Sequence, residues 1–213
     1  MSVTIKTVSS VKDFKTFARF ANRLYKGNKY YVPSMPMDDL STFSKEKNAA
    51  FEFSDAEFYL AYKDGEVVGR VAAIINHKAN EAWKVKQVRF GWIDFIDDME
   101  VSAALLDAVI EFGRKAGMTQ IVGPLGFTDF DPEGMLVDGY DRLGTMALIY
   151  NHPYYPEHMK KHGYIKEIGW VENRITIPVA LPEKFNNGAD LVHQKYNLKV
   201  RKFTVRQIKK LNY

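Results

Sequence analysis

One stretch decides the fold, residues 88–127, which read VRFGWIDFIDDMEVSAALLDAVIEFGRKAGMTQIVGPLGF. Residues 88–97 are almost continuously apolar, as expected of an interior strand that is covered on both faces. Residues 97–100 have the form of a capping box, and residues 101–117 repeat apolar side chains at helical spacing before a terminal glycine. Residues 118–127 again favour a strand. A strand, a crossover helix and a second strand predict a parallel pair.

The flanking segments complete a mixed sheet. Asp64-Gly65 lies between two β-rich runs and is a strong hairpin signal, so two antiparallel strands are predicted at residues 57–76. The remaining periodicity predicts a short strand at residues 3–8, helices at 11–27, 38–48 and 151–163, and a long final strand at 165–179. The predicted fold class is α/β (α+β), with a mixed, mostly antiparallel sheet and helices on both faces.

Length and composition fit one large domain with an appendage. The 213 residues are 46% hydrophobic and 26% charged, which is ordinary for a soluble globular protein. There is no cysteine, which excludes disulfides and thiolate metal sites and is compatible with a reducing cytoplasm. The N-terminus lacks the apolar core of a signal peptide, and no apolar run approaches the roughly 20 residues of a membrane span. We therefore expect a cytoplasmic protein without a membrane partner.

The net charge of +4 is unevenly distributed. Residues 183–213 hold eight basic and two acidic residues and carry +6, which leaves −2 for the rest of the chain. A basic arm can bind nucleic-acid phosphates, but apolar residues interleave with these charges, and Val205, Ile208 and Leu211 start an amphipathic helix. Nucleic acid is therefore not the expected partner. Residues 179–213 are predicted to be an extension that packs across the domain, reaches a neighbouring chain in a homodimer, or begins a second similar half.

An acidic loop follows the predicted parallel pair, GFTDFDPEGMLVDGYD at residues 126–141. Asp129, Asp131 and Glu133 alternate as in a calcium-binding loop, but Tyr140 stands where the bidentate glutamate would be, so no metal is expected. The loop lies at the carboxyl end of a strand, where open α/β sheets bind ligands. The three acids are predicted to face a cationic amine substrate. The alternative is a loop that only holds itself together through its own turns.

The order of these elements, with the ending from Asn151 to Gly163-Tyr164, resembles the GNAT acyltransferase superfamily. The segment FGWIDFIDD…GPLGFTDFDPEG is also similar to a bacterial branch of that superfamily. The resemblance covers residues 1–178 and implies an acyl-CoA N-acyltransferase-like domain, in which a splayed strand-helix-strand unit holds acyl-coenzyme A. It therefore implies an N-acyltransferase that takes acetyl-CoA or another acyl-CoA as co-substrate and acts on a small-molecule or peptide amine.

The resemblance also implies a set of cofactor-binding residues. The backbone of Phe95, Ile96 and Asp97 would hold the thioester carbonyl, Ser102 lies in the opening turns of the helix that follows, and Asn151 matches an asparagine that touches the cofactor in the family.

One departure weakens this expectation. The family's phosphate-binding loop contains glycines and a Gln or Arg, because free backbone amides at a helix N-terminus bind the pyrophosphate. Here the corresponding stretch is FIDDMEVS, in which Asp97, Asp98 and Glu100 would occupy those amides and repel a diphosphate. The alternative hypothesis is therefore a catalytically silent binding module on the same fold.

Asp94 is the candidate general base, since burial in the strand would raise the pKa of its carboxyl toward the working range. Its alternative role is to pair with an arginine or a backbone amide. The family's proton-donating tyrosine falls at His158 here, so Tyr154 or Tyr155 is the candidate acid, the alternative being that these rings only fill space under the helix. His158 and His162 are interpreted as surface histidines.

Overall fold

The structure is a computed structural model that describes residues 2–145, 149–180 and 182–208. The chain divides into two compact units, Met1–Lys166 and Glu167–Tyr213. The boundary near residue 178 that the sequence suggested stays a prediction.

Five strands form one sheet in the order β1-β2-β3-β4-β5. They are β1 (Thr4–Thr7), β2 (Ser54–Lys63), β3 (Glu66–Asn76), β4 (Gln87–Phe95) and β5 (Gln120–Val122). The first four pair antiparallel, and β5 pairs parallel to β4. The predicted mixed, mostly antiparallel sheet is confirmed, as are the hairpin and the parallel pair.

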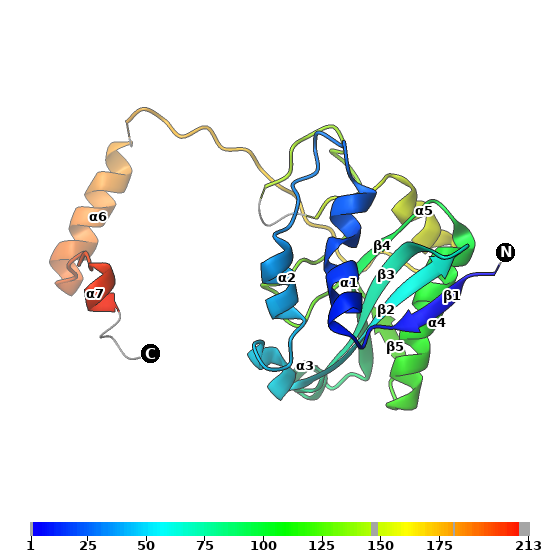
Figure 1. Cartoon of the computed structure of the whole chain (residues 1–213). Helices are drawn as coiled ribbons and strands as arrows, with labels where there is room; N and C mark the ends of the chain where they lie inside the picture. Colours follow the sequence, from blue (N-terminus) through cyan, green and yellow to red (C-terminus); the bar gives the residue numbers. More distant parts are fainter. Residues whose placement is uncertain (1, 146–148, 181, 209–213) are drawn as a thin grey trace. The chain divides into compact units, whose positions relative to one another are not determined.

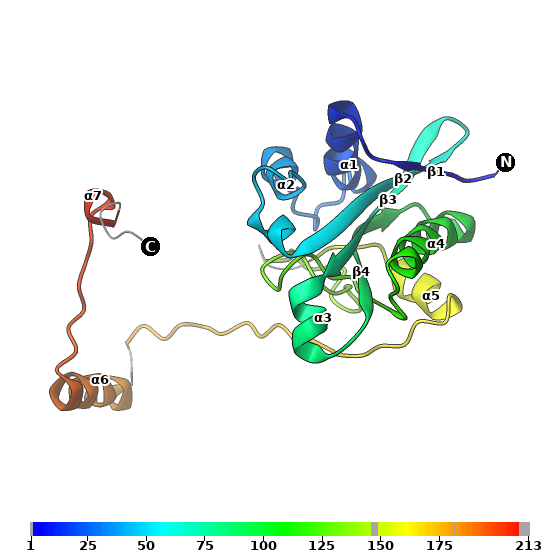
Figure 2. The same cartoon turned by 90° about the horizontal axis from the view of Figure 1, so that it is seen from below.

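The helices of the first unit cover both faces of this sheet. They are α1 (Val11–Leu24), α2 (Pro36–Thr42), the short 3-10 helix η1 (Ala49–Glu52), α3 (His77–Trp83), α4 (Met99–Lys115) and α5 (Tyr154–Lys161). α1 and α2 lie on one face, and α4 and α5 lie on the other (Figures 1 and 2). The helix predicted at 38–48 is present in its first part as α2, which ends at Thr42. α3 was not predicted.

Successive side chains along the interior strands point to opposite faces of the sheet, so each face has its own hydrophobic core. Leu60 and Ile74 belong to the core that contains Phe17 of α1. Their neighbours in the strands belong to the opposite core, with α4 and α5. α4 packs closely on β4, because a Cβ atom on Gly113 would lie only 2.5 Å from Cγ1 of Val88.

Capping residues fix where the long helices begin. Oγ of Ser10 accepts a hydrogen bond from the Asp13 amide at 3.1 Å, and the Asp13 carboxylate accepts from the Ser10 amide, which makes a capping box for α1. α4 is capped by Asp98 and not by Asp97, so the predicted capping box was placed one residue early. The reason is a tight turn, in which the Asp98 amide donates to the carbonyl of Ile96 at 2.7 Å.

A β-bulge in β4 positions the candidate site. The register against β3 shifts so that β4 holds one extra residue near Trp92, whose φ is 45°. Asp94 is thereby set opposite Arg70. The chain after β5 crosses over β4 at Gly91, where a Cβ atom would lie 2.5 Å from the carbonyl oxygen of Leu125, so this crossing requires glycine.

The second unit contains α6 (Glu183–Tyr196) and α7 (Val205–Ile208). The long final strand predicted at 165–179 is wrong, because these residues have no regular structure. A strand needs a neighbour for its backbone N–H and C=O groups, and within the described residues this segment pairs with none. The predicted helix at Val205 is present, while Leu211 lies outside the described residues.

Candidate active site

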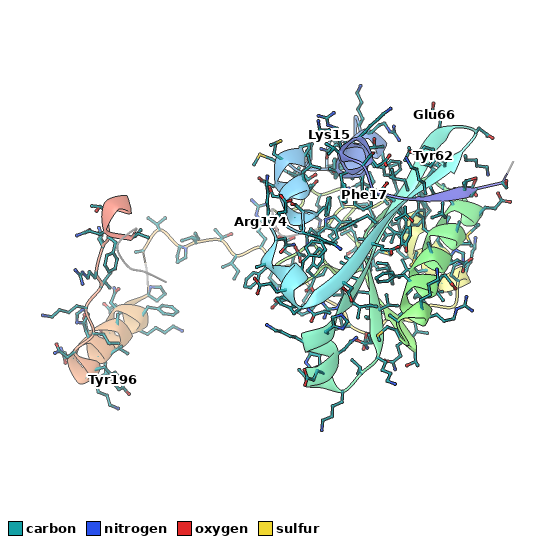
Figure 3. The ribbon with its side chains drawn as sticks, turned by 60° about the horizontal axis from the view of Figure 1, so that its bottom comes forward. Lys15, Phe17, Tyr62, Glu66, Arg174 and Tyr196 are labelled. Atoms are coloured by element: carbon teal, nitrogen blue, oxygen red, sulfur yellow. The ribbon has the colours of Figure 1, made fainter. Side chains whose placement is uncertain are left out.

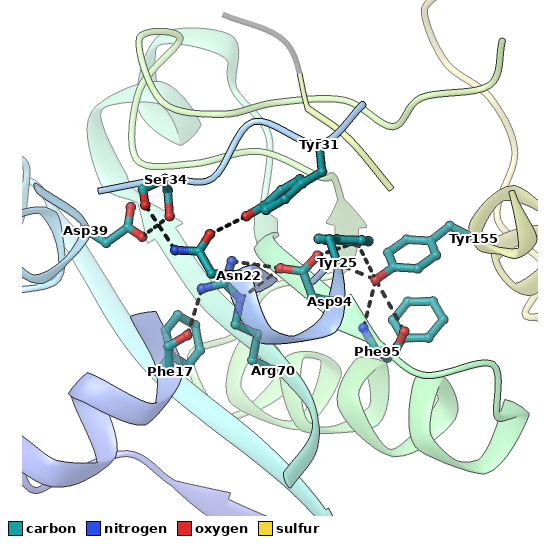
Figure 4. A network of polar contacts seen from close by, with 10 residues as sticks. All are labelled: Phe17, Asn22, Tyr25, Tyr31, Ser34, Asp39, Arg70, Asp94, Phe95 and Tyr155. Atoms are coloured by element: carbon teal, nitrogen blue, oxygen red, sulfur yellow. Dashed lines mark hydrogen bonds and ion pairs between the residues drawn. The ribbon is translucent and has the colours of Figure 1, made fainter. Parts of the chain in front are cut away.

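A buried ion pair lies where β4 ends. Nη2 and Nε of Arg70 are 2.7 and 2.8 Å from Oδ2 of Asp94. Nη1 of Arg70 donates to the carbonyl of Phe17 at 2.7 Å, which ties the pair to α1 (Figure 4). Both charged side chains are buried. Asp94 is thus buried, as expected of a candidate general base. It also pairs with an arginine, as the alternative role predicted.

Two phenols complete the surroundings of Asp94. Tyr25, which follows α1, donates to Oδ1 of Asp94 at 2.8 Å, and Oη of Tyr155 lies 2.9 Å from Oη of Tyr25. The Phe95 amide donates to Tyr155 at 2.9 Å. Because the Tyr25 hydroxyl donates its proton to Asp94, the Tyr155 hydroxyl is the donor in the hydrogen bond between the two phenols. The hydrogen bonds therefore run in one direction, from the Phe95 amide through both phenols to Asp94 (Figure 4).

Burial controls the protonation of this network. It raises the pKa of the Asp94 carboxyl, and the Arg70 charge and the Tyr25 hydrogen bond oppose that rise. Burial also raises the pKa of the Tyr25 and Tyr155 hydroxyls, and the nearby Asp94 charge adds to the effect. Both phenols therefore stay protonated, and Asp94 is the group in the network that can accept a proton.

Half-buried aromatic rings cover Tyr25. The ring centroids of Tyr31, Tyr150 and His152 lie 4.7, 5.5 and 4.9 Å from that of Tyr25. Two hollows formed by described residues lie elsewhere, one of about 470 Å³ on the outer face of α1 and one of about 260 Å³ between α2 and the acidic loop. Because Asp94 and Tyr25 are both buried, a substrate reaches Asp94 only after side chains that cover it move.

The backbone at the end of β4 is already hydrogen-bonded. Tyr155 accepts from the Phe95 amide, and Tyr154 donates to the Phe95 carbonyl at 2.6 Å. The Ile96 amide donates to a carbonyl of β3 at 3.0 Å. A thioester could bind this backbone only after the two phenols move, and the cofactor-binding role of Phe95, Ile96 and Asp97 stays a prediction.

A second polar cluster joins α4 to α5. Oγ of Ser102 lies 2.9 Å from Nδ1 of His158 and 2.8 Å from Nε2 of His162. Nε2 of His158 lies 2.9 Å from Oδ1 of Asp97, whose side chain is 67% exposed. His158 is buried, so its interpretation as a surface histidine is wrong. His162 is half-buried, and burial lowers the pKa of its ring. The i, i+4 spacing could not show which helix face meets α4.

The Asp97 carboxylate accepts, so Nε2 of His158 is the donor in that contact. The Ser102 hydroxyl also lies 3.2 Å from the carbonyl of Met99, so its single proton is shared among three acceptor positions. A serine–histidine–aspartate chain is the arrangement of nucleophilic triads, but Ser102 is fully buried. Its predicted role in cofactor binding stays a prediction.

Lys63 compensates part of the acidic turn that opens α4. Its Nζ lies 2.5 Å from Oδ2 of Asp98 and 3.2 Å from Oε2 of Glu100. The hydrogen bond from Lys63 lowers the pKa of Asp98. The Glu100 amide donates to Oδ1 of Asp98 at 2.9 Å, and the Val101 amide donates to the carbonyl of Asp98 at 3.1 Å. Amides that could bind a diphosphate are thus bonded within the helix terminus.

Asn151 is buried and joins the acidic loop to the start of α5. Its side-chain oxygen accepts from the Leu136 amide at 2.6 Å, and its side-chain nitrogen donates to the carbonyls of Leu136 and His152 at 3.1 Å each. Its role toward a cofactor stays a prediction.

The acidic loop begins at the opposite end of β4 from Asp94. Arg89 donates to two carbonyls at the start of the loop, at 3.1 Å each. It precedes Asp94 by five residues, or about 16 Å along a strand. Asp131 accepts from the amide three residues before it at 2.9 Å, as the turn-forming alternative expects. No hydrogen bond or ion pair among described residues links Asp129, Asp131 or Glu133 to the Asp94 network, and their substrate role stays a prediction.

No family model matches the chain. Protein YghO of Escherichia coli is 29% identical over 164 residues, which are 77% of this chain and 42% of that protein. The bacterial ceramide synthase of Caulobacter vibrioides is 24% identical over 165 residues, which are 77% of this chain and 43% of that protein. The chain therefore spans less than half the length of either curated relative.

The mixed sheet with its crossover helix and parallel final strand has the arrangement that the sequence resemblance implied. A solved structure described as a predicted acetyltransferase with acetyl-CoA, from Clostridium acetobutylicum, is similar with a TM-score of 0.49 and 11% identity, over 81% of this chain and 96% of that chain. Among the described residues, no helix combines the length and apolar content that crossing a membrane requires.

Tyr25 and Arg70 were not among the predicted site residues. Arg70 gave a signal, because it is the one charged residue in the apolar run of residues 67–75, and a buried charge needs a partner. Tyr25 gave none, since it fits the apolar stripe of its helix.

Proposed function

We propose that the chain is an N-acyltransferase, which transfers an acyl group from a thioester, acetyl-CoA or another acyl-CoA, to an amine. The observation that carries this proposal is the one-way chain of hydrogen bonds that ends on Asp94. A buried carboxylate with a raised pKa, reached through a phenol, is suited to take a proton from an ammonium group.

In the proposed reaction, the substrate ammonium gives a proton to Oη of Tyr25 as Tyr25 gives its own to Asp94. The amine nitrogen then attacks the thioester carbonyl carbon, so that a C–N bond forms and the C–S bond breaks. The thiolate takes a proton from Tyr154 or Tyr155. Burial raises the pKa of Tyr154 and keeps that phenol protonated until this step. The second amine proton, lost as the amide forms, restores this phenol, and Asp94 releases the first proton to solvent. The ammonium thus loses two protons in all, the thiolate gains one, and one is released to solvent.

Aromatic rings support an amine as the acceptor. Tyr31 and Tyr150 are half-buried beside Tyr25, and an ammonium group is attracted to such ring faces. Ceramide is the amide of a long-chain amine, and one relative is named a ceramide synthase. A long-chain amine therefore belongs with small-molecule and peptide amines among the acceptors to test.

The second candidate function is a catalytically silent binding module. It is favoured by the turn that opens α4, where Lys63 contacts only Asp98 and Glu100. The amides of Glu100 and Val101 in this turn are already bonded. These contacts disfavour a diphosphate at that position.

Calorimetric titration with acetyl-CoA and release of free thiol in the presence of each amine separate the two functions. Asp94→Asn and Tyr25→Phe are each expected to lower the transfer rate by about a hundredfold or more, while Asp55→Asn, which changes an exposed acid of β2, leaves it unchanged. Thermal unfolding of each variant shows whether it is folded. If millimolar thioester gives neither binding heat nor thiol release, the enzyme hypothesis is rejected and the binding module remains.

A further inference from the structure

The outer face of α1 carries a basic stripe. Lys12, Lys15, Arg19 and Arg23 are spaced three or four residues apart, which places them on one side of the helix. All four are exposed, whereas Phe17 is buried in the core. Figure 3 shows Lys15 on the outer side of α1 and Phe17 on the side toward the sheet. The four basic residues also line the hollow of about 470 Å³ described above.

This charge belongs to a longer basic segment. Residues 11–39 contain six basic residues and three acids. Asp13 is buried and paired with Lys6 at 2.7 Å, and Asp38 and Asp39 lie in the first turn of α2. The segment therefore carries +3, although residues 1–182 as a whole carry −2. Like charges along one helix face repel one another. This face is where the first unit would attract an anionic surface.

Exposed apolar side chains adjoin the stripe. Val32, Met35 and Met37, in the loop after α1 and at the start of α2, are 51%, 67% and 72% exposed. The loop is held to the end of α1, because Nδ2 of Asn22 donates to the carbonyl of Ser34 at 3.0 Å. Cations and exposed apolar groups thus lie next to each other.

We propose that α1 and residues 26–37 form a docking face for an anionic lipid surface. The stripe would contact lipid phosphates, and Val32, Met35 and Met37 would enter the headgroup region. Peripheral membrane contacts combine a basic surface with exposed apolar groups in this way. An acidic protein would match the cations but would leave the three apolar side chains unexplained. α1 itself stays in the fold, since its apolar face is buried in the core.

The earlier expectation of no membrane partner rested on the lack of a spanning segment, which does not bear on contact with a lipid surface. The docking face also ends beside the candidate active site, because Tyr25 follows α1 directly and bonds Asp94. A long-chain amine held in a membrane would reach that site from the docking face. This last link rests on the proposed function, whereas the docking itself does not.

Co-sedimentation of the whole chain with vesicles tests the docking face. We expect binding to vesicles that contain phosphatidylglycerol, little binding to phosphatidylcholine alone, and weaker binding at raised salt. Each basic residue near such a surface contributes about fivefold in affinity, so Lys12→Glu, Lys15→Glu and Arg19→Glu together should lower it by about a hundredfold or more. The matched control changes Lys86, Lys160 and Lys161, which lie outside the docking face, to glutamate. This control should lower the affinity for the vesicles far less.

A fluorescent probe distinguishes vesicle binding through the docking face from vesicle binding through the basic tail at residues 183–213. The chain has no cysteine, so Met35→Cys gives a single labelling position, and Lys86→Cys gives its control. An environment-sensitive dye at position 35 should shift to the blue on anionic vesicles, and the same dye at position 86 should not. An unshifted dye at 35, equal binding to neutral vesicles, or binding that survives the triple reversal would overturn the proposal. So would the absence of vesicle binding, including the case in which an acidic polypeptide binds instead.

Discussion

Two ion pairs near the end of β4 are similarly short but lie in different surroundings. Arg70 and Asp94 are 2.7 Å apart and buried, whereas Lys63 and Asp98 are 2.5 Å apart and partly exposed to solvent. A surface pair contributes about 0–1 kcal/mol to folding. In a buried pair, loss of one partner leaves a charge that water no longer reaches. Burial, and not distance, therefore decides how much each pair matters.

The largest effect is expected from Arg70→Met, which leaves Asp94 without its cation. We expect the free energy of unfolding to fall by about 3–5 kcal/mol, because the remaining charge is buried. Urea unfolding of the variant beside the unchanged chain measures this. The double variant with Asp94→Leu should recover most of the loss, since no buried charge remains. A single variant as stable as the parent would contradict the buried pair.

A smaller effect is expected from Tyr155→Phe. The Phe95 amide loses its acceptor and Tyr25 loses a donor, so unfolding should become easier by about 1–3 kcal/mol. The acyl transfer rate should also fall, because the phenol chain is broken. Tyr164→Phe is the matched control, since Oη of Tyr164 has no hydrogen-bond partner among the described residues. Equal losses in the two variants would show that the loss does not come from the hydrogen bonds of the Tyr155 hydroxyl.

The smallest effect concerns the pair of Lys6 and Asp13 at the start of α1. The hydrogen bonds from Lys6 and Ser10 lower the pKa of Asp13 to about 2, below its ordinary value of 3.8. A lowered folded-state pKa adds stability above the unfolded pKa, and that stability is lost as pH falls through the folded pKa. The difference in stability between the parent and Asp13→Asn should therefore be constant near neutral pH and shrink below about pH 4. Urea titrations at several pH values would show a flat difference if the pair were absent.

The predictable part of this fold depends on local signals. The Asp64-Gly65 turn, the helical stripe of α4 and the apolar run of β4 each lie within one short segment, and each was found. The strand predicted at 165–179 failed because alternation describes one strand and says nothing of the neighbour that it needs. α3 was missed because a seven-residue helix gives too few turns to show a period.

The candidate site was predicted only in part for a related reason. Asp94 was found from its place in the sequence, but Arg70 and Tyr25 are 24 and 69 residues away from it and meet it only in the folded chain. His158 was misjudged in the same way, because Ser102 lies 56 residues before it. Pattern within one segment indicates which side chains are buried, and contacts between segments decide their partners.

The close contact between Gly113 and Val88 also affects residues at the other end of α4. Ser102 stands eleven residues earlier on α4, about 17 Å along the helix axis. A methyl group at position 113 would push that end of α4 away from Val88 and tilt the helix. The tilt would move Ser102 away from His158 and His162. Alanine at position 113 should therefore disturb the contacts of Ser102 with both histidines, although Gly113 makes none of them.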